Sequence, residues 1–122
     1  MLINLSNHPL EKWQKNQTET AKKLYGTLRD LPFPQINPNW DEDKVEEYAK
    51  LYFDEILAIL ESSSEPTNAV HVMGELTFTF NLVNKLLRQN IECVASTTER
   101  QTIEDNDSKL SVFNFVKFRK YK

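Results

Sequence analysis

The sequence has very little glycine and cysteine, and it carries no excess of positive charge. Two of its 122 residues are glycine and one, Cys93, is cysteine, which excludes an internal disulfide and suits a reducing cytoplasm. Lysine and arginine number 15 against 18 aspartates and glutamates, and this formal net charge of −3 argues against general DNA or RNA binding. A small anionic ligand held in a local pocket is compatible with this balance.

Long apolar runs and nucleotide-binding glycine motifs are missing as well. No segment approaches the roughly 18 apolar residues of a membrane span, and residues 1–13 lack the basic and apolar regions of a signal peptide. We therefore expect a cytoplasmic protein that does not contact a membrane. Neither G-x-G-x-x-G nor G-x-x-x-x-G-K-[ST] occurs, which disfavours dinucleotide binding and excludes a P-loop. His8, His71 and Cys93 show no metal-ligand spacing, so we expect no metal and no cofactor.

What the sequence does contain is an alternation of apolar blocks and helical stripes. The blocks predict strands over 2–5, 27–31, 69–73, 91–95 and 112–118, and the stripes predict helices over 10–25, from a cap at Asn39 or Asp41 to Leu60, and over 75–90. Alternation of this kind implies a parallel sheet with helices on both faces. We predict a single domain, residues 1–122, with an α/β fold: a three-layer Rossmann-like sandwich whose mostly parallel sheet ends in a C-terminal antiparallel edge strand.

Three polar segments follow three of the predicted strands. They are Ser6-Asn7-His8, Met73-Gly74-Glu75 and the segment from Ser96 to Arg100. Ligands of open α/β sheets bind outside the carboxyl ends of the strands, so these segments form one site if their strands are neighbours. The helix that begins after Gly74 would add free backbone N–H groups for an anion. Each segment also has a plainer interpretation, as a turn, a helix cap, a strand end or a solvated ion pair between Glu99 and Arg100.

Several other residues are given structural roles. His71 lies inside an apolar strand and is interpreted as a satisfied core or interface histidine, and Cys93 as a small buried hydrophobe. The basic residues from Lys117 to Lys122 are interpreted as a solvated tail. Glu75 has three possible roles, because a carboxylate beside phosphates is repelled: it points away, caps the helix or acts as a base.

Four segments together resemble a known family. Residues 3–8 (INLSNH), 70–86 (VHVMGELTFTFNLVNKL), 96–100 (STTER) and 115–121 (FVKFRKY) look like small single-domain CRISPR-associated Rossmann-fold proteins, which are candidate ring nucleases of type III CRISPR systems. The resemblance covers the second half of the chain well, whereas residues 10–65 match only in layout. It implies a homodimer that binds a cyclic oligoadenylate, most often cyclic tetra-adenylate, and opens it without a metal by attack of the ribose 2′-hydroxyl on the adjacent phosphate.

Roles for individual residues follow as hypotheses. His8 would transfer protons, and Arg100 and Thr98 would contact the reacting phosphate, with Arg100 stabilising its charge. The expected ligand-binding residues are Ser6, Asn7, Gly74, Glu75, Thr77, Ser96 and Thr97. Two alternatives stay open: a sensor that binds the ring without cleaving it, and an accessory protein that uses the edge strand 112–118 for contacts.

Overall fold

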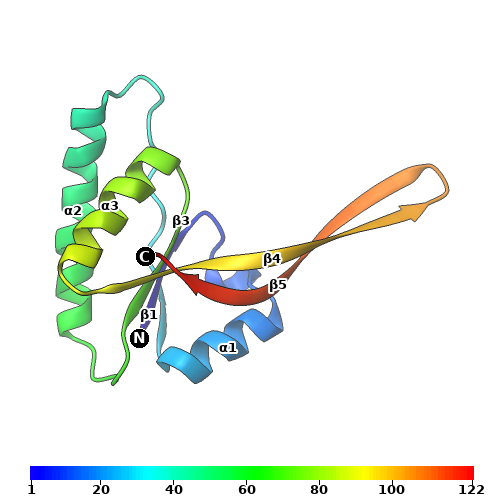
Figure 1. Cartoon of the computed structure of the whole chain (residues 1–122), viewed down its shortest axis with the longest axis horizontal. Coiled ribbons are helices and arrows are strands. Elements are labelled where there is room, and N and C mark those ends of the chain that lie inside the picture. Colours follow the sequence, from blue (N-terminus) through cyan, green and yellow to red (C-terminus); the bar gives the residue numbers. More distant parts are fainter.

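The computed structural model describes residues 1–122 and shows a five-stranded sheet between two helical layers (Figure 1). The elements in chain order are β1 (Leu2–Ser6), the short 3-10 helix η1 (Leu10–Lys12), α1 (Lys15–Tyr25), β2 (Leu28–Asp30), α2 (Glu42–Glu61), β3 (Ala69–Met73), α3 (Leu76–Arg88), β4 (Glu92–Asp105) and β5 (Ser108–Lys120). The strand order is β2-β1-β3-β4-β5, and only the β4–β5 pair is antiparallel. The predicted α/β sandwich with an antiparallel edge strand is confirmed.

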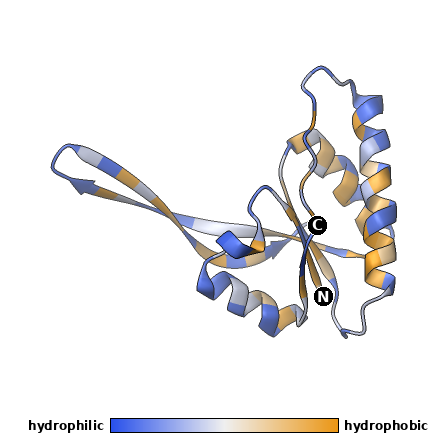
Figure 2. Ribbon diagram, turned by 180° about the vertical axis from the view of Figure 1, so that it is seen from behind, coloured by the Kyte–Doolittle hydropathy of each residue, from blue (hydrophilic) through white to orange (hydrophobic).

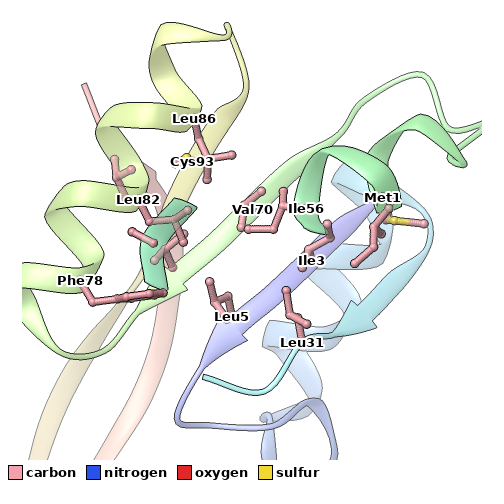
Figure 3. Packing of buried hydrophobic residues seen from close by; sticks show 14 of the residues in the cluster. Met1, Ile3, Leu5, Leu31, Ile56, Val70, Phe78, Leu82, Leu86 and Cys93 are labelled. Carbon is pink, nitrogen blue, oxygen red and sulfur yellow. The ribbon is translucent and has the colours of Figure 1, made fainter. Parts of the chain in front are cut away.

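One face of the sheet is apolar and supports α2 and α3. Ile3 and Leu5 of β1 and Val70 and Val72 of β3 alternate onto this face, because successive side chains of a strand point to opposite sides. They pack against buried residues of the two helices, among them Ile56, Phe78, Leu82 and Leu86 (Figure 3). Figure 2 shows the hydrophobic residues of α2 and α3 gathered where these helices meet the sheet. The molecule's larger core therefore lies on this side.

A side-chain cap fixes where α2 begins. The Asp41 side chain accepts a hydrogen bond from the backbone N–H of Lys44 at 3.1 Å and caps α2. Of the two predicted caps, Asn39 and Asp41, the structure therefore uses Asp41.

Cys93 is buried in the larger core, as expected, and burial together with the nearby Glu92 charge raises the pKa of its thiol to about 12. A thiol with that pKa is not a nucleophile at neutral pH.

The last two strands differ from the prediction. β4 does not end at residue 95 but continues to Asp105, and β5 begins at Ser108 rather than at 112. Beyond the sheet the two strands form a twisted two-stranded arm that projects from the body, with a hydrophilic turn at its tip (Figures 1 and 2). Asn106, with φ 48°, makes that turn. The segment from Ser96 to Arg100, predicted to be a loop, is therefore part of a strand.

The first helix is also shorter than predicted. Residues 10–25 divide into η1 and α1, since Trp13 and Gln14 are extended between them. Trp13 turns inward and is buried against α1 and the sheet, which interrupts the helical path. None of the helices is both long and apolar enough to cross a lipid bilayer.

Candidate functional site

The sheet face that α1 covers carries a chain of buried polar side chains. Asn4 of β1 and His71 of β3 are only 1% and 2% exposed. His71 Nδ1 lies 2.9 Å from Asn4 Oδ1, and His71 Nε2 lies 2.8 Å from the hydroxyl of Ser96 on β4. Ser6 donates to Asn4 Oδ1 at 2.8 Å, and Gln17 of α1 donates its amide to the Ser96 hydroxyl at 3.1 Å. Three neighbouring strands and α1 are thus joined by one hydrogen-bond network.

The partners of Asn4 fix the direction of these hydrogen bonds. Its amide nitrogen faces two acceptors, the carbonyl oxygen of His8 and the carboxylate of Asp30, each at 2.9 Å. Its oxygen must then face His71, so Nδ1 of His71 carries the ring proton and Nε2 accepts from Ser96. Burial, with a smaller contribution from the His8 charge, lowers the pKa of His71 to about 4. His71 is therefore a neutral imidazole at pH 7.

Beside this network the surface is hollowed. The hollow has a volume of about 330 Å³, and we call it the polar hollow. Its lining residues are Ser6, Asn7, His8, Trp13, Gln14, Gln17, His71, Met73, Ser96, Thr98, Phe113 and Phe115. It lies at the carboxyl ends of β1 and β3, where the strand order reverses and ligands of α/β sheets bind. No lysine or arginine is among the lining residues.

The polar hollow brings together half of the ten predicted site residues. Ser6 reaches it from the end of β1, Asn7 and His8 from the turn that follows, and Ser96 and Thr98 from β4. The neighbouring positions of β1, β3 and β4, on which this prediction depended, are confirmed. The contribution of β4 comes from alternate residues of a strand, which share a face, rather than from a loop.

Arg100 and Thr97 do not line the hollow. Arg100 follows Thr98 on the same face of β4, where it donates to the Ser111 hydroxyl at 3.0 Å and lies 6.0 Å from the centre of the Phe113 ring. Its guanidinium therefore stands at the margin of the hollow, beside one of its lining aromatics. The Thr97 hydroxyl instead bonds the backbone of Lys117, at the irregularity in the β4–β5 pairing.

The start of α3 is separate from the polar hollow. Glu75 caps this helix, because its carboxylate accepts the backbone N–H groups of Thr77 at 3.0 Å and Phe78 at 2.8 Å. Burial opposes the charge of Glu75, but these hydrogen bonds and one from the Thr77 hydroxyl outweigh it and lower its pKa. The capping alternative is confirmed. The start of this helix was expected to offer free N–H groups to an anion, but those of Thr77 and Phe78 are taken by the protein's own carboxylate.

Gly74 also faces another part of the molecule. A Cβ atom at this position would lie 2.2 Å from the ring of Phe33, so the glycine makes room for that side chain. Phe33, Asn7 and Glu75 line a second, more open hollow of about 710 Å³ together with residues 34–38 and Trp40. Of the predicted residues, only Asn7 borders both hollows.

Sequence reasoning missed several residues of the polar hollow. His71 is a buried, hydrogen-bonded histidine as expected, but its place in the lining was not foreseen. Trp13, Gln17 and the two phenylalanines of β5 were not singled out, nor was Asn4, which lies in the network beside the hollow. A signal was present for two of them: Asn4 and His71 are the polar residues inside otherwise apolar strands, and in the parallel register they are direct partners. No cluster of three or more His, Cys, Asp or Glu side chains suited to a metal ion occurs in the structure.

Fold and site define a small α/β sandwich protein with a histidine-containing polar hollow at the switch point of its sheet. A family model matches residues 1–119, and the chain belongs to that family, described as the uncharacterized protein MJ1673 family. No curated protein and no solved structure matches the chain.

Proposed function

We propose that this protein is a member of the CRISPR-associated Rossmann-fold group that it resembles, and that it binds a cyclic oligoadenylate and opens it as a ring nuclease. The observation that carries the proposal is the convergence of Ser6, His8, Ser96 and Thr98 at the switch point of the sheet, beside the exposed ring of Phe113. Hydroxyl and imidazole groups suit ribose and phosphate oxygens, and aromatic rings suit adenine faces.

The charges around the hollow are consistent with such a ligand. The lining residues include no lysine or arginine, and Arg100 at the margin supplies a positive charge close to Phe113. Guanidinium groups bind phosphate through paired N–H donors. Release of the weak contacts to Ser111 would free Arg100 for this role, because exposed hydrogen bonds of this kind contribute little to stability.

The size of the hollow supports a dimeric binding unit. A volume of about 330 Å³ is near the lower end of the range for small-molecule sites, so it suits one or two nucleotides rather than a ring of four. Two copies related by a two-fold axis would offer each contact twice to a symmetric cyclic tetra-adenylate. We propose a homodimer for this reason, and a cytoplasmic one, in which Cys93 stays reduced.

The proposed reaction needs no metal and consumes no water. The ribose 2′-oxygen attacks the adjacent phosphorus, the bond from phosphorus to the 5′-oxygen breaks, and the products are a 2′,3′-cyclic phosphate and a 5′-hydroxyl. One proton leaves the 2′-hydroxyl and one reaches the 5′-oxygen. Much of the rate would come from holding the 2′-oxygen in line with the leaving group. His8 can transfer a proton through Nδ1, since its Nε2 is bonded to the Lys12 carbonyl oxygen at 3.0 Å.

Labelled cyclic tetra-adenylate, incubated with the purified protein and EDTA, tests the proposal. We expect binding and a linear product that ends in a cyclic phosphate. Arg100→Ala should lower cleavage at least tenfold, because one charge-assisted contact contributes about 1.5–3 kcal/mol. Arg119→Ala is the matched control, since this exposed arginine of β5 does not line the hollow. Absence of binding by the unmodified protein would overturn the proposal, and binding without cleavage would leave the sensor alternative.

Exposed apolar side chains on β5 favour a second candidate function, contact with a protein partner. Phe113 and Val116 of β5 are 57% and 55% exposed, within the edge strand that sequence analysis associated with such contacts. If this function is the relevant one, a partner captured by the protein should be lost on Val116→Asp, whereas Arg100→Ala should not affect its capture.

A further inference from the structure

The chain from Asn4 through His71 to Ser96 has the geometry of a proton-accepting relay. We propose that Ser96 and His71 are the base of the proposed ring-opening reaction: Ser96 Oγ takes the proton of the attacking 2′-hydroxyl while it passes its own proton to His71 Nε2. Asn4 is a positioning residue that holds the imidazole by Nδ1. This inference rests on the proposed function and names the group that activates its nucleophile.

The direction of the hydrogen bonds supports the relay. Because Asn4 Oδ1 can only accept, His71 keeps its proton on Nδ1 and presents a bare Nε2 to the Ser96 hydroxyl at 2.8 Å. The hydroxyl that faces Nε2 belongs to a half-buried residue that lines the polar hollow, so the relay opens onto the proposed ligand.

The Ser96 oxygen has one remaining position for a ligand. It donates its hydrogen to His71 and accepts the Gln17 amide at 3.1 Å, which leaves one of its two lone pairs free. A ribose hydroxyl is a donor that fits this lone pair. The same contact that orients the 2′-oxygen would therefore also remove its proton.

His8 completes the proton balance of the step. The electron pair of the broken bond from phosphorus to the 5′-oxygen stays on that oxygen, which takes a proton from Nδ1 of a protonated His8. His71 gains one proton as His8 loses one, so the charge of the pair stays constant. Burial and, to a smaller extent, the His8 charge oppose protonation of His71 at rest, and the part due to His8 disappears as His8 gives up its proton. The carboxylate of Asp30 accepts a hydrogen bond from the Asn4 amide at 2.9 Å and so helps to hold Asn4 Oδ1 toward His71.

Four variants test the relay. Ser96→Ala should lower the cleavage rate of bound cyclic tetra-adenylate about 100-fold, the usual contribution of general base catalysis, with binding changed less than about threefold. Ser96→Thr keeps the hydroxyl and should retain most of the rate. His71→Gln should lose about as much as Ser96→Ala, and the double variant no more than either one, because the two residues act as a unit. Thr102→Ala, on the same face of β4 but outside the hollow, is the matched control.

The outcomes separate this inference from the proposed function. If the unmodified protein does not bind the ring, the proposed function fails first. If it binds and cleaves but Ser96→Ala cleaves normally, only the relay is overturned, and if it binds without cleaving, the relay is overturned while a sensor role stands. Independently of any ligand, ¹⁵N NMR should find the neutral His71 ring protonated on Nδ1, and protonation on Nε2 would overturn the relay.

Discussion

The two faces of the central strands β1 and β3 differ sharply, although they are built from alternate residues of the same ten positions. One face presents Ile3, Leu5, Val70 and Val72 to a dry core, whereas the other presents polar groups such as Asn4 and His71 to one another. Burial of apolar side chains stabilises the folded state whichever apolar groups they contact, whereas buried polar groups stabilise it only when each one has a hydrogen-bond partner. The first face therefore holds the fold together, and the second specifies one arrangement of side chains around the hollow.

The largest effect is expected from the apolar face. Phe78 is fully buried, with its ring 5.2 Å from that of Phe33 and 5.5 Å from that of Tyr52. Phe78→Ala should lower the free energy of unfolding by about 3–5 kcal/mol, because it removes buried apolar surface and leaves a cavity. Urea denaturation followed by circular dichroism measures this change. A loss below about 1 kcal/mol would contradict the assignment of the main core to this face.

The polar face should respond to pH where the apolar face does not. The pKa of His71 is about 4 in the folded protein, against about 6.5 for a histidine in the unfolded chain. Protonation therefore favours the unfolded state, so this contribution is fully present above about pH 6.5 and is lost as the pH falls toward 4. The loss is on the order of 3 kcal/mol. Stability measured from pH 7.5 to 4.5 should fall more steeply for the unmodified protein than for His71→Gln, and equal slopes would contradict the shift.

The smallest expected effects have opposite signs on the two faces. The Thr79 hydroxyl on α3 is buried without a hydrogen-bond partner, so Thr79→Val should raise the free energy of unfolding by about 1 kcal/mol. Ser6→Ala on the polar face should lower it by about 1–2 kcal/mol, because the Ser6 hydroxyl donates to Asn4 and accepts the backbone N–H of His8. Thermal unfolding of both variants provides the comparison, and effects of the same sign would show that pairing does not distinguish the faces.

The sequence was sufficient to predict the fold because apolar blocks of strand length are separated by helical stripes. Residues 69–73 and the start of β4 lie within the sheet, where burial leaves a clear pattern. The outer part of β4, from residue 98 to Asp105, is exposed on both sides and has no such pattern, so sequence analysis suggested only an extended continuation over 101–104 and not one long strand. This part of the chain is a strand only because its backbone pairs with that of β5, and no local pattern within residues 98–105 indicates the pairing.

The site could be predicted only in part, for a related reason. Polar residues at strand ends are visible in the sequence, and two of the three predicted segments supply Ser6, Asn7 and Ser96 to the polar hollow. The arrangement of the phenylalanines of β5 could not be predicted from the sequence, because it depends on an irregularity in strand pairing. Thr97 pairs with Lys117 and Thr98 with Phe115, which leaves Val116 as an extra residue. This shift puts Phe115 and Phe118 in contact, with ring centres 4.9 Å apart, on the side of α1. The role of His71 depended likewise on distant partners.

Two amide side chains of the first helical region have a consequence for how this protein meets other copies of itself. Gln14 bonds both the carbonyl oxygen of Phe113 and the N–H of Phe115, and Asn16 bonds the carbonyl oxygen of Phe115. These are backbone groups of the outermost strand, which would otherwise be free to recruit a sixth strand from a second chain. The amides imitate such a strand over this stretch, so they guard the molecule against open-ended aggregation along its sheet.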